Sequence, residues 1–146
     1  MMQRKLNSRP GRPKAINRIH VINVAMNSYW NGGVQKMSLN EICRRANVSK
    51  PALYREFGNE DGLMTEVLEL YFTKFITPFF TLFSSHQSFH TVLQKLILGL
   101  INNQDKNLNS MGCLFTMMRD SHYLLGKKTK NKLDLLHKLL LKTYEQ

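Results

Sequence analysis

The sequence predicts an all-α fold, and three observations favour that class. Apolar residues recur three and four positions apart in several separate segments, which is the spacing of one helix face. Residues that favour helix ends stand between these segments, such as the N-cap residues Ser38 and Ser49 and the helix-terminating Gly58. No segment alternates apolar and polar residues as a half-buried strand would. We therefore expect helices throughout the chain.

Two short helices are predicted between Ser38 and Phe57, separated by a turn of about three residues. The first follows the N-cap Ser38, and the second follows Ser49, has Pro51 in its first turn and directs Leu53 and Phe57 inward. The apolar residues of the first helix are Leu39, Ile42, Cys43 and Ala46. The outward residues of the second are Lys50, Ala52, Tyr54 and Arg55. This is the pattern of a helix-turn-helix, whose second helix enters the DNA major groove.

Residues on both sides of this motif extend the pattern. A first helix is expected from about Lys14 to Asn31, and its matching residues are Val21, Ile22, Val24, Ala25 and Tyr29, followed by Gly33. The motif itself matches at Ser38, Leu39, Ile42, Cys43, Ala46, Asn47, Val48 and Ser49, then at Leu53, Tyr54 and Phe57, and the pair Leu63 and Met64 follows. In this order the residues resemble the N-terminal domain of the TetR family of bacterial transcriptional regulators. The resemblance covers roughly a third of the chain.

The resemblance implies a cytoplasmic, homodimeric repressor that binds a palindromic operator in double-stranded DNA and is released by a small apolar ligand. The charge distribution agrees with nucleic acid as a partner. The net charge is +11, and residues 1–57 contain eleven Lys and Arg against two acidic residues. An anionic membrane is a weaker alternative, because the only tryptophan, Trp30, stands beside a Gly-Gly turn rather than on a basic amphipathic segment.

Other classes of protein are disfavoured by the sequence. The two cysteines, Cys43 and Cys113, form neither a disulfide framework nor a zinc site, which favours a reducing compartment. No segment is apolar for long enough to cross a membrane, so we expect a soluble protein. No phosphate loop, paired carboxylates or histidine cluster is present, so we expect no enzyme activity, cofactor or metal.

Residues 1–14 contain five Lys or Arg residues and no acidic residue. A segment of this composition cannot bury enough apolar surface to fold alone. It is either a solvated tail or a basic arm in which Arg9 and Arg12 lie along the DNA minor groove, and we favour the arm.

The rest of the chain is predicted to form further helices. A fourth helix should begin after Asn59, with Pro78 interrupting the pattern. A core-facing helix is expected from the spacing of Phe89, Leu93, Leu96, Ile97, Leu100 and Ile101. Another opens at Gly112 and stops near Gly126, and the last covers residues 127–146 with Leu133, Leu136, Leu140 and Tyr144 on one stripe. The expected domains are an arm (1–14), a helix-turn-helix domain (15–60) and a helical ligand-binding and dimerisation domain (61–146).

The residues expected at the DNA are Arg9, Arg12, Ser38, Arg45, Ser49, Lys50, Pro51, Ala52, Tyr54 and Arg55. Lys50 is equally suited to a guanine edge and to a phosphate, while Ser38 and Ser49 can cap helices without touching DNA. The resemblance implies that Tyr54 contacts a phosphate. Glu56 and Glu60 depart from the family's pattern, and an exposed carboxylate at either position is expected to repel phosphate.

The side chains expected to line an apolar ligand pocket are Met64, Phe83, Phe115, Met117 and Met118, although ordinary core packing explains each of them. The family usually continues with two long dimerising helices, and this sequence stops inside the first. We therefore expect a weak homodimer. The alternative is a shortened DNA-binding remnant, or an interfering partner of a longer relative, without a ligand response.

Overall fold

The computed structural model describes residues 15–83, 88–102 and 112–144, and these residues form helices without a strand. The helices of the N-terminal part are α1 (Arg18–Gly32), α2 (Leu39–Ala46), α3 (Lys50–Phe57) and α4 (Glu60–Tyr71). A π-helical turn, η1 (Phe72–Ile76), leads into α5 (Thr77–Phe83), and α6 (Phe89–Asn102) follows. The remaining elements are α8 (Leu114–Asp120), the 3-10 turn η2 (His122–Leu124) and α9 (Lys127–Tyr144). The predicted all-α class is confirmed.

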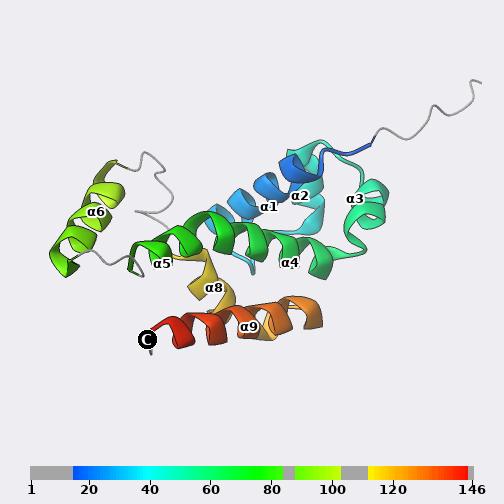
Figure 1. Cartoon of the computed structure of the whole chain (residues 1–146). Helices are drawn as coiled ribbons and strands as arrows, with labels where there is room; N and C mark the ends of the chain where they lie inside the picture. Colours follow the sequence, from blue (N-terminus) through cyan, green and yellow to red (C-terminus); the bar gives the residue numbers. More distant parts are fainter. Residues whose placement is uncertain (1–14, 84–87, 103–111, 145–146) are drawn as a thin grey trace, which may run out of the picture.

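Helix α4 lies between α1 on one side and α9 on the other (Figure 1). Its inward residues Leu63, Val67 and Leu68 are fully buried. They belong to one continuous hydrophobic cluster that includes Ile42 and Leu53 of the helix-turn-helix and Leu133 of α9. The core around α1 to α4 is therefore completed by α9.

The single tryptophan joins α1 to the C-terminal half. Trp30 is 1% exposed, and its indole N–H donates a hydrogen bond to the carbonyl oxygen of Gly112 over 2.8 Å. The Trp30 ring meets the rings of Tyr71 and Phe75 edge to face, with 5.2 Å between centroids in both pairs. Burial, followed by the hydrogen bond to Cys113, raises the pKa of the Tyr71 hydroxyl.

Three details differ from the sequence-based expectation. Helix α1 begins at Arg18 rather than near Lys14, because the Asn17 side chain accepts a hydrogen bond from the His20 amide and caps the helix there. The predicted interruption at Pro78 is wrong, since η1 runs directly into α5. In η1 the Thr77 amide bonds to the Phe72 carbonyl, and this wider turn gives the proline ring room that a regular helix denies it.

The third difference concerns α6, which was expected to face the core. Leu93 is 41% and Ile97 47% exposed, whereas Val92 is buried. Helix α6 stands apart from α1, α4 and α9 and packs against α5 (Figure 1). The side chains of Phe89, Leu96, Leu100 and Ile101 lie outside the described residues.

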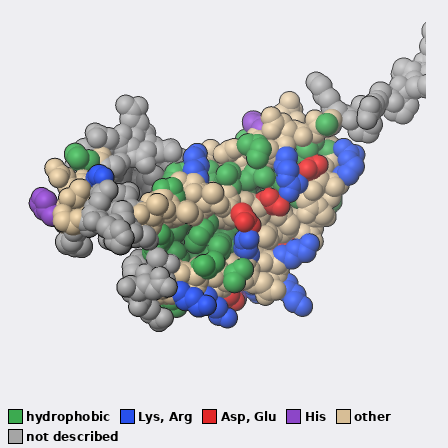
Figure 2. All heavy atoms as spheres, in the orientation of Figure 1, with side chains coloured by type: hydrophobic (Ala, Val, Ile, Leu, Met, Phe, Trp, Pro, Cys, Tyr) green, Lys and Arg blue, Asp and Glu red, His purple; other side chains and the backbone are tan. Residues whose placement is uncertain are grey.

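The stripe expected on the last helix is covered by the chain's own core. Leu133 and Leu136 are buried, and Leu140 packs against the same cluster, while the Tyr144 side chain lies outside the described residues. The exposed leucines of α9 are Leu135, Leu139 and Leu141. Figure 2 shows hydrophobic side chains gathered over α8 and the adjoining part of α9, with Lys and Arg along the outer edge of α9.

Candidate nucleic-acid interface

Helices α2 and α3 form the predicted helix-turn-helix, and side chains cap both of them. Ser38 Oγ accepts a hydrogen bond from the Glu41 amide, and Ser49 Oγ accepts one from the Ala52 amide, each over 3.3 Å. Asn47 ends α2 in the left-handed conformation, with φ of 54°. Asn47 and Ser49 thus end α2 and begin α3 within the short turn between them, while Ser38 fixes the start of α2.

Helix α3 has one buried and one open side. Leu53 and Phe57 are buried, while Lys50, Pro51 and Arg55 are exposed and Ala52 is half-buried. Tyr54 is 40% exposed, and Lys50 Nζ lies 5.8 Å from the centre of its ring. Cationic, aromatic and small residues therefore share the open side of α3, as a helix that reads a groove requires.

Arg45, which was expected at the DNA, is engaged within the domain. Its Nε donates to Glu41 Oε1 over 2.7 Å and its Nη1 donates to Ser28 Oγ over 3.3 Å. Arg44 binds the same carboxylate through two hydrogen bonds. Arg44 and then Arg45 lower the pKa of Glu41 to about 2.

Glu56 and Glu60, which depart from the family's pattern, have partners inside the domain. Glu56 Oε1 accepts a hydrogen bond from Arg18 Nη1 over 2.9 Å, and Glu60 Oε1 accepts one from the Tyr29 hydroxyl over 3.5 Å. Arg18 also donates to Glu66 over 2.7 Å and stacks on the Phe57 ring. The hydrogen bond to Glu56 is the main cause of the raised pKa of Arg18.

These contacts explain how a basic DNA-binding domain tolerates the two carboxylates. Glu56 joins the end of α3 to α1 and, through Arg18, to α4. Burial and then the neighbouring Glu60 raise the pKa of the Tyr29 hydroxyl, so Tyr29 stays neutral and remains a donor. Both carboxylates therefore support the fold. Sequence reasoning missed Arg18, whose partners stand 38 and 48 positions away along the chain.

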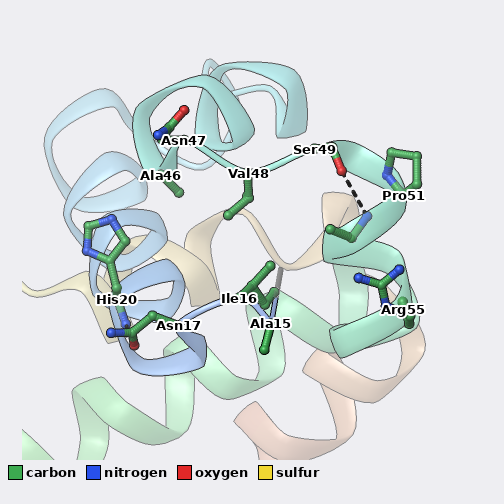
Figure 3. Close-up of a pocket in the computed structure, with 11 residues that line it drawn as sticks. Ala15, Ile16, Asn17, His20, Ala46, Asn47, Val48, Ser49, Pro51 and Arg55 are labelled. Atoms are coloured by element: carbon green, nitrogen blue, oxygen red, sulfur yellow. Dashed lines mark hydrogen bonds between the residues drawn. The ribbon is translucent and has the colours of Figure 1, made fainter. Parts of the chain in front are cut away.

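A groove of about 540 Å³ lies between the start of α1 and the helix-turn-helix (Figure 3). Ala15 and Ile16 form one wall, and Pro51, Ala52 and Arg55 of α3 form another. Residues 1–14 lie outside the described residues, but Ala15, to which they are attached, borders the same groove as α3. Any contact made by Arg9 or Arg12 therefore starts from this side of α3.

Glycines bring the end of α3 against the start of α4. Gly58 has φ of +79° and ends α3, and the Asn59 side chain caps α4 by accepting from the Gly62 amide over 2.8 Å. A Cβ on Gly62 would lie 1.9 Å from the carbonyl oxygen of Phe57. The first turn of α4 therefore directly supports the last residue of α3. A glycine in the first turn of a predicted helix was the one sequence signal of this close approach.

The residues expected around a ligand do not border the groove beside α3. Met64, Phe115 and Met118 are buried in the hydrophobic cluster, and Met117 packs against it. The side chain of Phe83 lies outside the described residues. Among the described residues, no group of three or more His, Cys, Asp or Glu could hold a metal ion.

We expect the Glu41 carboxyl group to titrate at about 2 instead of near 4.5, because its ionised form accepts hydrogen bonds from two guanidinium groups. Its contribution to stability is complete above the unfolded-state pKa and is lost as the pH falls from about 4.5 towards about 2. An NMR titration of the carboxyl carbon measures this pKa. Arg45→Gln should raise it, and Lys36→Gln is the control that removes a charge elsewhere. A midpoint near 4.5 in the unaltered protein would contradict the network.

Comparison with known proteins agrees with the geometry of α2 and α3. The sequence model described as "Bacterial regulatory proteins, tetR family" matches residues 21–67. The HTH-type transcriptional repressor ComR of Escherichia coli (strain K12) is 29% identical over 104 residues, which are 70% of this chain and 50% of that protein. The chain thus spans about half the length of this curated relative. No solved structure matches.

In the described part of the chain, no helix combines the length and apolar character needed to cross a membrane. Regulators of the matched family are generally not enzymes.

The matched residues begin in α1 and run through α2 and α3 into α4. They therefore include the capped turn, the open side of α3 and the first turn of α4, which supports the end of α3. Over these matched residues, the chain has the N-terminal helix-turn-helix domain typical of the TetR family of bacterial regulatory proteins.

Proposed function

We propose that the protein represses transcription by binding a palindromic operator as a homodimer, with α3 of each copy in the DNA major groove. The observation that carries the proposal is the open side of α3, where Lys50, Tyr54 and Arg55 are exposed above the buried Leu53 and Phe57. The similarity to a repressor, ComR, supports repression rather than activation. A palindrome is read by two such helices about one DNA turn apart.

The expected contacts divide into two kinds. The first kind is made by the start of α3, where Lys50, Pro51, Ala52 and Arg55 face the base edges or the flanking phosphates. The second kind is made to phosphate alone, by the hydroxyl of Tyr54 as a donor. Ser38 and Ser49 already accept amide hydrogen bonds through Oγ, which leaves each hydroxyl proton free to be donated to a phosphate. Arg45 donates to Glu41 and Ser28 through Nε and Nη1, so a contact with a phosphate would use its remaining N–H donors or replace one of these partners.

The domain division proposed from the sequence follows these roles. Residues 1–14 serve as a basic arm, residues 15–60 bind DNA and residues 61–146 respond to a ligand and dimerise. Release by a small apolar ligand requires the methionine and phenylalanine side chains at Met64, Phe115, Met117 and Met118 to move apart, because three of them are buried in the core. Methionines suit such an opening, since their side chains repack readily.

The first prediction concerns base reading. We expect Lys50→Ala to change the sequence selected from a random duplex pool and to cost about 1–3 kcal/mol on the preferred site. Tyr54→Phe should weaken all duplexes alike, by about 0.5–1.5 kcal/mol, because it removes one hydroxyl from phosphate. Lys138→Ala and Tyr123→Phe are matched controls at exposed residues of α9 and η2. Equal retention of selected and random duplex at every salt concentration would contradict a specific regulator.

The second prediction concerns the arm. Deleting residues 1–12 removes Arg4, Lys5, Arg9 and Arg12 and leaves every described helix intact. Affinity for duplex DNA should fall, and its salt dependence should become shallower by about 0.9 in the log–log slope for each phosphate that the arm no longer neutralises. A variant that keeps the full arm but changes these four residues to Gln distinguishes the effect of the arm's charge from the effect of its length. If the salt dependence does not change, residues 1–14 do not contact DNA and are a solvated tail.

The third prediction concerns assembly. Exposed apolar residues on α6 (Leu93, Ile97) and on α9 (Leu135) offer surface to a second copy. Sedimentation at several protein concentrations should show a weak, concentration-dependent homodimer. The double variant Leu93→Gln and Ile97→Gln tests α6 as the dimer interface, and Leu135→Gln tests α9. The variant that weakens dimerisation identifies the interface, and Ile19→Gln on α1 is the control at another exposed residue. A monomer at every concentration would contradict operator binding as a preformed dimer.

A further inference from the structure

The first turn of α4 touches two helices through neighbouring residues. On one side Gly62 supports the end of the recognition helix, because the Phe57 carbonyl oxygen occupies the space where a Cβ would be. On the other side the carboxylate of Asp61 meets the beginning of α9. The recognition helix and the C-terminal helix are thus held by adjacent residues of the same turn.

Asp61 caps α9 from outside that helix. Gly126 stands at the N-cap position, since its carbonyl accepts from the Lys130 amide, but it has no side chain that could cap. Asp61 Oδ2 accepts from the Lys128 amide over 2.9 Å, and Oδ1 accepts from the Thr129 amide over 3.0 Å. A Cβ on Gly126 would lie 2.2 Å from the Asp61 carboxyl carbon, so only glycine lets α9 approach this closely.

The Thr129 side chain completes the joint. It is fully buried, and its hydroxyl lies 2.6 Å from Asp61 Oδ1 and 3.1 Å from the hydroxyl of Thr65. Thr65 in turn donates to the Asp61 carbonyl oxygen over 2.7 Å. Burial alone raises the pKa of Asp61, but the hydrogen bonds from Thr129 and Lys128 outweigh it and lower the pKa. The carboxylate is therefore ionised whenever the joint is formed at neutral pH.

We propose that Asp61 is a positioning residue for DNA binding, which makes the placement of the recognition helix depend on the docking of α9. The inference rests on the proposed function, because its readout is affinity for duplex DNA. With the cap, α9 fixes the first turn of α4, and that turn fixes the Phe57 end of α3. Without the cap, two α9 amides lose their partner and the turn that supports α3 is held from one side.

The direction in which DNA affinity changes when Asp61 is replaced distinguishes this proposal from a purely electrostatic effect of its charge. Asp61 carries a negative charge four residues after the end of α3, so removing it reduces repulsion of DNA phosphates and by itself raises affinity. Loss of positioning lowers affinity instead. Because the hydrogen bonds of the cap go to a charged acceptor, and only the part of their free energy that holds α3 in place reaches DNA binding, we expect Asp61→Ala to weaken binding about tenfold.

The test uses the full chain and the duplex selected by the unaltered protein, with affinity measured by fluorescence anisotropy. Asp61→Ala removes the cap and its charge. Gly126→Ala displaces the carboxylate but keeps the charge, and Thr129→Val removes one donor with little change of volume. Glu69→Ala is the matched control, since it breaks the ion pair with Lys132 that joins the same two helices farther along α4. Circular dichroism confirms that each variant is folded at the temperature used.

Weaker binding by the three joint variants, with Glu69→Ala close to the unaltered protein, would support the proposal. Tighter or equal binding by folded Asp61→Ala would overturn it. Amide hydrogen exchange in α9, measured with and without DNA, is a second test, because a residue that only stabilises the fold would not make this exchange depend on DNA. Because coupling is reciprocal, duplex DNA should slow exchange in the peptide containing Lys128 and Thr129, and this protection should vanish in Thr129→Val.

If Asp61→Ala does not fold, Gly126→Ala and Thr129→Val decide the result in the same way. Failure of the unaltered chain to bind any duplex is a different outcome. It would overturn the proposed function, and it would be visible before any variant is compared.

Discussion

The structure depends on one constraint, which is that α4 must be covered on two sides at once. Leu63, Val67 and Leu68 are fully buried, and no single neighbouring helix could enclose them. Helix α1 covers one side and α9 the other, while α2 and α3 pack against the free part of α1 and the start of α4. The DNA-binding helices are therefore stabilised by the last helix of the described chain.

The local features of this arrangement could be predicted from the sequence because each depends on adjacent residues. Ser38, Ser49 and Asn59 cap helices by accepting hydrogen bonds from the amides three positions on, and Gly58 ends α3 by its positive φ. The open side of α3 follows from helical spacing once Leu53 and Phe57 are assigned to the core. Family resemblance and physical pattern gave the same boundaries here.

The features that could not be predicted depend on distant residues. Glu56 was expected to repel phosphate, but its charge is balanced by Arg18, which meets it only through the packing of α1 on α3 and α4. Arg45 was assigned to DNA from its position, yet Glu41 one turn earlier already holds it. Apolar spacing correctly predicted α6 as a helix, but spacing alone does not say which partner covers an apolar face, and Leu93 and Ile97 are exposed.

The buried Trp30 has an optical consequence. It is the only tryptophan, so all indole emission from this protein comes from the place where α1, η1 and residue Gly112 meet. An indole enclosed by Tyr71 and Phe75 emits at shorter wavelength than one in water, and its emission shifts when water reaches it. The native chain thus carries its own spectroscopic probe of contact between its N-terminal and C-terminal parts, without an added label.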